Sequence, residues 1–102
     1  MTDVERALER LASAGIQLLP AALASHLVFE RNGFLCLVER AGDGFGHIGT
    51  PGLMTEKGFA ALVWRGDAAW FVGKGFEQPA APGQVEEIRA FAADLQAALR
   101  PA

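Results

Sequence analysis

The sequence is poor in cysteine and lysine and contains no long apolar run. Cys36 is its one cysteine, so no intrachain disulfide can form, which is typical of proteins in a reducing compartment. No apolar stretch approaches the length of a membrane-spanning segment, and the charged start Met-Thr-Asp-Val-Glu-Arg lacks the apolar core of a signal peptide. We therefore expect a cytoplasmic protein. The abundance of Ala, Gly and Arg over Lys suits a GC-rich bacterial genome.

Positive charge is also scarce. Lys and Arg number 9 against 12 Asp and Glu, which gives a formal net charge of -3. The basic residues form no cluster, and this argues against nucleic-acid binding, because the phosphate backbone requires a positive surface. No CxxC, HExxH or EF-hand spacing occurs, so the sequence predicts no metal site and no cofactor.

Apolar residues, in contrast, are abundant. They make up 51% of the 102 residues, which excludes intrinsic disorder as the main state of the chain. The length suits a single domain over residues 1–102 with one core. Because a domain of this size has little interior, some apolar side chains are expected to remain at its surface.

Two segments have the periodicity of amphipathic helices. In the first, Thr2 and Glu5 are spaced as a capping box and Gly15 is a C-terminal stop. The second covers residues 84–99 and ends before Pro101. Their apolar stripes are Val4, Ala7, Leu8 and Leu11 in the first, and Val85, Ile88, Phe91, Leu95 and Leu99 in the second.

Residues 26–40 predict a β-hairpin that turns at Asn32-Gly33, the strongest two-residue turn signal. We expect its more apolar face to form the core under the helices, whereas the other face carries both apolar and polar side chains. The core face would pair Arg31 with Phe34, Phe29 with Cys36, and Leu27 with Val38; the mixed face would pair Glu30 with Leu35, Val28 with Leu37, and His26 with Glu39.

Residues 59–75 predict a second hairpin that turns at Gly66-Asp67. Neither of its faces is polar, and its two tryptophans lie near the turn on opposite faces. One face would hold Ala61, Val63, Trp70 and Val72; the other would hold Leu62, Trp64, Ala69 and Phe71.

The hairpins therefore offer more apolar strand surface than two helices can cover, since a half-solvated antiparallel sheet normally alternates apolar and polar residues. We predict an α+β fold of the order α-β-β-loop-β-β-α. Its antiparallel sheet would have four strands, or five if residues 16–19 pair at an edge, packed by the N-terminal and C-terminal helices. The uncovered surface predicts a companion molecule.

Residues 42–58, between the hairpins, are rich in glycine and are expected to form a loop. They include Gly44-Phe45-Gly46-His47-Ile48-Gly49, which matches GxGxxG. That motif binds nucleotides only where a helix follows it, and Pro51 and Gly52 interrupt a helix here. The glycines are better explained by a tight crossing of the sheet.

Two classes of function fit this sequence. The first is a non-enzymatic interaction module, a homodimer whose interface includes Trp64 and Trp70, which binds a protein, a peptide or a small apolar molecule. The alternative is a small ligand-binding domain or enzyme with a pocket under the loop at 42–58. In that case His47, Thr50 and Lys57 would supply the polar groups.

Overall fold

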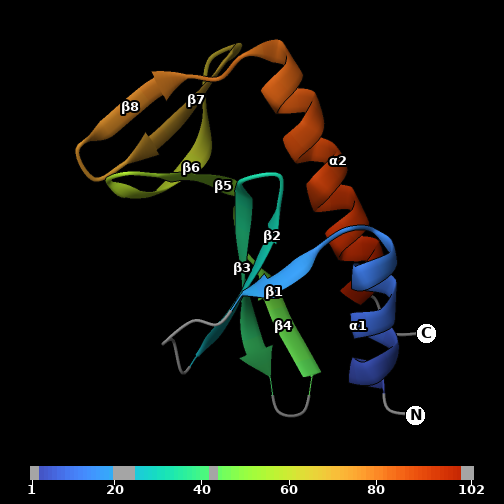
Figure 1. Ribbon diagram of the computed structural model, residues 1–102. Helices are drawn as coiled ribbons and strands as arrows, with labels where there is room; N and C mark the ends of the chain where they lie inside the picture. Colours follow the sequence, from blue (N-terminus) through green and yellow to red (C-terminus); the bar gives the residue numbers. More distant parts are fainter. Residues whose placement is uncertain (1–2, 20–24, 42–43, 100–102) are drawn as a thin grey trace.

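The computed structural model describes residues 3–19, 25–41 and 44–99, and it is an α+β fold with a helix at each end of the chain (Figure 1). Eight antiparallel strands lie between the helices and form one curled sheet, a half-barrel. The elements are α1 (Asp3–Ser13), β1 (Gln17–Leu19), β2 (His26–Arg31), β3 (Phe34–Ala41), β4 (Gly44–Ile48), β5 (Gly52–Thr55), β6 (Gly58–Arg65), β7 (Ala68–Gly73), β8 (Phe76–Pro79) and α2 (Pro82–Leu99).

The sheet is a meander in which strands adjacent in the chain pair with each other, with one exception at β3. The order is β1-β2-β3-β5-β6-β7-β8, and β4 also pairs with β3. Near its N-terminal end β3 pairs with β5, as at Phe34 and Leu53, whereas nearer its C-terminal end it pairs with β4, as at Val38 and Ile48. Strands β4 and β5 therefore lie one after the other along β3 and act as a single interrupted strand.

The prediction of four or five strands is wrong, because the sheet has eight. The segment expected to be a loop at 42–58 supplies β4 and β5, and β8 was not predicted at all. The fifth strand, which was the alternative for residues 16–19, is present as β1. Glycine explains part of the error. A Cβ at Gly52 would lie 2.1 Å from the Ala60 carbonyl oxygen, so β5 needs a glycine at this position. Because glycine is rare in strands, strand propensities predict a loop there.

Both predicted hairpins are confirmed, with the predicted registers. In the first, Phe29 lies opposite Cys36 and Asn32 has a φ of 54°, the left-handed conformation that an Asn-Gly turn requires. In the second, Val63 lies opposite Trp70. The turn residues thus determine which side chains share each face of the sheet.

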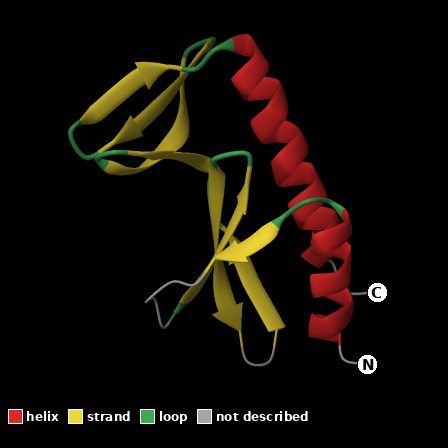
Figure 2. Cartoon of the chain, viewed as in Figure 1, coloured by secondary structure: helices red, strands yellow, loops and turns green. Residues whose placement is uncertain are grey.

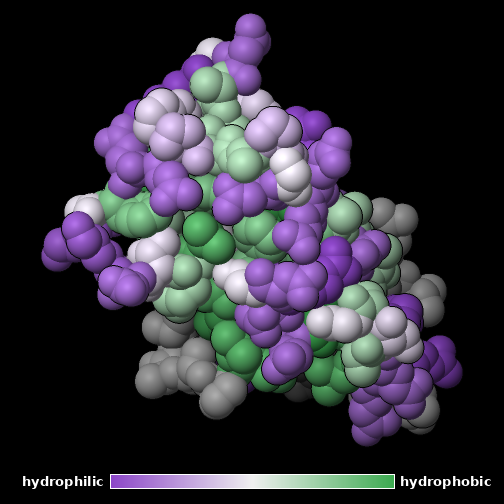
Figure 3. Space-filling view, turned by 45° about the horizontal axis from the view of Figure 1, so that its top comes forward, coloured by the Kyte–Doolittle hydropathy of each residue, from purple (hydrophilic) through white to green (hydrophobic). Residues whose placement is uncertain are grey.

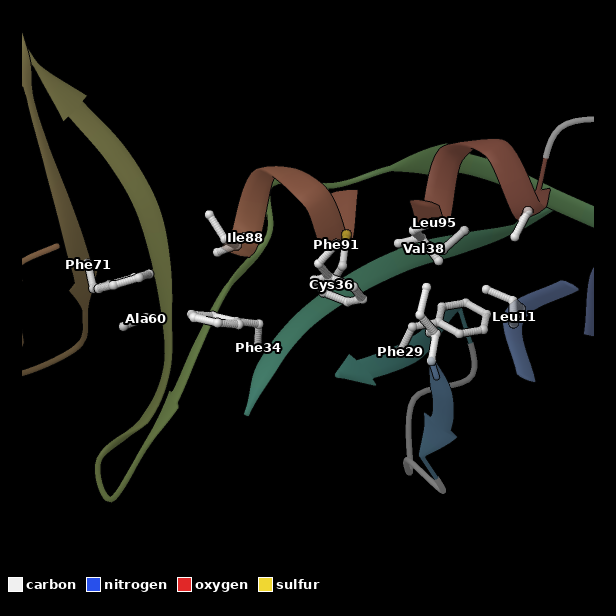
Figure 4. Packing of buried hydrophobic residues seen from close by; sticks show 12 residues of the cluster. Leu11, Phe29, Phe34, Cys36, Val38, Ala60, Phe71, Ile88, Phe91 and Leu95 are labelled. Carbon is white, nitrogen blue, oxygen red and sulfur yellow. The ribbon is translucent and has the colours of Figure 1, made fainter. Parts of the chain in front are cut away.

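The core lies between one face of the sheet and the helices (Figure 4). This is the face of Phe29 and Cys36, as predicted, and it continues onto Phe71 in the second hairpin. Helix α2 covers it with Ile88, Phe91, Leu95 and Ala98, and α1 contributes Leu11.

The helices lie against each other on the same side of the sheet (Figure 2). Arg31, at the end of β2, holds both of them in place: its guanidinium donates to the Asp94 carboxylate of α2 at 2.7 Å and to the Ala14 carbonyl after α1 at 3.1 Å.

Helix α2 begins at Pro82, two residues before the predicted start, and α1 is followed by Gly15 at a φ of 75°. Thr2 and Pro101 lie outside the described residues. No helix in the described ranges is long and apolar enough to cross a membrane.

Candidate interaction surface

The sheet face that points away from the core carries apolar side chains, and we call it the open face. Its members do not belong to the core cluster, and most of them are half-buried; Leu35 is buried and Met54 is exposed. Apolar side chains also show at the molecular surface in Figure 3, bordered by hydrophilic ones. The members of the open face are Val28, Leu35, Leu37, Met54, Phe59, Ala61, Val63, Trp70 and Val72.

A groove of about 410 Å³ lies at the end of the sheet where β6 turns into β7 and α2 begins. We call it the tryptophan groove, because both tryptophans line it. Its walls are apolar except for one carboxylate. The lining residues are Trp64, Asp67, Ala68, Ala69, Trp70, Pro79, Ala80, Pro82 and Val85.

The two tryptophans reach this groove from opposite faces of the sheet, as their alternation in the hairpin predicted. Trp64 lies on the helix side, 49% exposed, and the Arg89 guanidinium stands 5.2 Å from the centre of its ring. Trp70 lies on the open face, opposite Pro79 of β8. Because Trp70 belongs to both surfaces, the groove and the open face are continuous.

The charges around the groove fall into two groups. Arg65, 5.1 Å from the centre of the Trp70 ring, forms an ion pair with Glu77. Asp67 in the groove and Arg89 beside it form no ion pair with any residue of the described chain. Asp67 and Arg89 are therefore charges of opposite sign at the tryptophan groove that have no ionic partner among the described residues.

Both tryptophans can be identified from the sequence, but the α2 side of this groove cannot. Arg89, Pro82 and Val85 come from α2, and the packing of a helix start against a hairpin turn more than ten residues earlier is a tertiary contact. The one local signal was Val85, an apolar position one turn ahead of the buried stripe.

The structure does not bring together His47, Thr50 and Lys57, the residues proposed for a ligand pocket. His47 is exposed on β4, beside the C-terminal half of β3. Lys57 lies in the turn between β5 and β6, and its ammonium group donates to the Gly75 carbonyl at 3.0 Å. Thr50 is exposed between β4 and β5, and β5 separates it from Lys57.

The cysteine, the metal-ligating residue types and the glycine-rich motif were the other candidates for chemistry in the described part of the chain. Cys36 is fully buried, and burial raises the pKa of its thiol to about 11, so it stays protonated near neutral pH. The described residues contain no group of three or more His, Cys, Asp and Glu side chains able to hold a metal ion. The GxGxxG match lies in β4 and is followed by another strand, without the helix that a phosphate site requires.

Comparisons with protein-family models, curated proteins and solved structures gave no significant match.

Proposed function

We propose that this protein is a non-enzymatic interaction module that works as a homodimer. The two copies meet through the tryptophan groove and the adjoining open face of β6 and β7. The observation that carries this proposal is the half-exposed indole of Trp64 beside an open apolar groove. A tryptophan at the surface is the residue type that most often dominates binding energy at protein interfaces.

A second copy fits this surface because the surface is self-complementary. A two-fold dimer uses the same patch on both subunits, so that patch must contain both a projecting group and a recess. The half-exposed ring of Trp64 supplies the apolar group and the groove of about 410 Å³, which it helps to line, supplies the recess. Each copy can therefore place its indole against the groove of the other.

The groove alone is too small for a stable interface, which needs about 800 Å² from each partner. The contact must extend over Trp70 onto its neighbours on the open face, Val63 and Val72. Both are half-buried apolar residues outside the core cluster. Burying them would provide the apolar centre that interfaces need, with the Arg65–Glu77 ion pair at the rim.

An interaction role also agrees with how the polar residues are distributed. Among the described residues no charged, hydroxyl or amide side chain is buried, and the one buried thiol, Cys36, is held in its protonated form, whereas catalytic groups commonly have pKa values shifted toward their function. The candidate ligand residues His47 and Lys57 lie on β4 and in the turn between β5 and β6, and neither lines the tryptophan groove.

The test is to place a carboxylate in the interface. Trp64→Glu and Trp70→Glu are each expected to convert the dimer to a monomer in size-exclusion chromatography with light scattering. Leu18→Glu is the matched control, because Leu18 is 45% exposed on the edge strand β1, and this variant should remain dimeric. Circular dichroism of all three variants should show the wild-type fold.

Two results would count against the interface. If both tryptophan variants stay dimeric, the two copies meet elsewhere. If Leu18→Glu dissociates as well, the loss reflects added charge and not the tryptophan groove. Trp64→Ala, which removes the projecting ring without adding charge, should also weaken the dimer, and it serves in place of Trp64→Glu if that variant does not fold.

A further inference from the structure

We infer that the two copies are held in register by reciprocal ion pairs, Asp67 of each copy with Arg89 of the other. This inference rests on the proposed dimer and specifies how its two subunits recognise each other. It starts from the two groups at the tryptophan groove that have no ionic partner in the described chain.

Arg89 is already placed for such a contact. It lies on the exposed side of α2, and its guanidinium lies over the ring of Trp64, 5.2 Å from the ring centre. A guanidinium carries five N–H donors, so a contact with an indole ring leaves donors that can bind a carboxylate. A carboxylate brought to the groove by a partner would meet these donors.

Asp67 supplies that carboxylate on the same surface. It is exposed in the turn after Gly66, whose φ of 65° sets the tight reversal, and it is the one charged residue among those that line the groove. Because a turn residue projects beyond the ends of β6 and β7, its side chain can reach across an interface.

Two-fold symmetry turns these two charges into two ion pairs. In such an interface a contact between Asp67 and Arg89 across the axis is repeated with the roles of the copies exchanged. Opposite charges on one patch are thus self-complementary. The neighbouring Arg65 and Glu77 do not compete, since they pair with each other.

The test uses charge reversal, with the dissociation constant measured by analytical ultracentrifugation. Arg89→Asp and Asp67→Arg should each raise the dimer dissociation constant at least about tenfold. Each reversal places like charges opposite each other at both symmetry-related contacts between residues 67 and 89. The double variant, with both reversals, should return to within about threefold of the wild-type value. Glu86→Arg, a reversal at another exposed residue of α2, is the control and should change the constant little.

A mixing experiment is sharper still. Each single variant alone faces like charges, but a pair made of one Arg89→Asp copy and one Asp67→Arg copy regains both ion pairs. The mixture should therefore form a heterodimer under conditions where each variant alone is monomeric. A general effect of net charge cannot explain why Asp67→Arg alone is monomeric, because this reversal makes the chain less negative than the wild type, whose formal net charge is -3, and would by itself favour self-association.

The outcomes separate this inference from the dimer itself. If the wild type is dimeric and Trp64→Glu dissociates it, but both reversals self-associate normally, the ion pairs are wrong and the dimer stands. If the single variants dissociate and neither the double variant nor the mixture recovers, the pairing is also wrong. A monomeric wild type overturns both proposals. If a reversal does not fold, Arg89→Gln and Asp67→Asn replace it, each with a smaller expected loss.

Discussion

Cys36 shows at the scale of one residue how position decides chemistry. Its side chain is fully buried between β3 and the helices, and its sulfur lies 3.3 Å from the Gly49 carbonyl oxygen, to which the thiol donates. Burial removes water from the thiolate, which therefore becomes costly, and the pKa rises from 9.0 to about 11. The residue acts as a small apolar side chain of the core.

This pKa predicts how stability changes at alkaline pH. Between pH 9 and about 11 the unfolded chain releases the thiol proton and the folded chain keeps it, so the free energy of unfolding should fall as pH rises. The loss should reach at most about 3 kcal/mol. Urea unfolding at pH 8, 9, 10 and 11 measures it, and Cys36→Ala provides the reference for other groups. A wild-type slope equal to that of Cys36→Ala would contradict the prediction.

Single residues were predicted well where local geometry decides them. Asn32-Gly33 set the register that places Phe29 opposite Cys36 in the core, as the sequence indicated. The suggested contact between His26 and Glu39 is different. They are opposite in register, but the His26 ring bonds to the hydroxyl of Ser25 at 2.7 Å, and side-chain choices of this kind depend on neighbours that the sequence does not specify.

At the scale of elements, the glycines of β4 and β5 concealed two strands. Strands are recognised by alternating side chains, and Gly44, Gly46 and Gly52 carry none. Gly52 is nevertheless required where it stands, because a Cβ there would lie 2.7 Å from the ring of Phe59. Strand β8 was missed for another reason: it has four residues, too few for a periodic signal.

Two glycine substitutions test this explanation. Gly52→Ala should destabilise the protein by about 1–3 kcal/mol, since β5 and β6 must move apart to admit the methyl group. Gly83→Ala in the first turn of α2 meets no atom within 4 Å and should stabilise by roughly 0.5–1 kcal/mol. Thermal or urea unfolding compares the two. Equal effects of the two substitutions would show that Gly52 is not tightly packed.

At the scale of the whole molecule, the sequence predicted the surplus of apolar strand surface but not its location. The apolar side chains on one face of both hairpins form the core. The other apolar side chains lie on the open face and in the tryptophan groove. The sequence placed Trp64 and Trp70 on opposite faces, and the start of α2 brings both onto one groove. The contact of α2 with both tryptophans depends on the direction in which the chain turns from β8 into α2. No local sequence pattern predicts that direction.

Sedimentation equilibrium of the wild-type protein tests the central claim most directly. Over roughly 1–100 µM, concentrations that bracket a micromolar dissociation constant, the mass should approach twice the 10.8 kDa of one chain. It should decline toward a single chain on dilution. A mass of one chain at every concentration would show that the tryptophan groove and the open face remain uncovered, and the proposed dimer would be wrong.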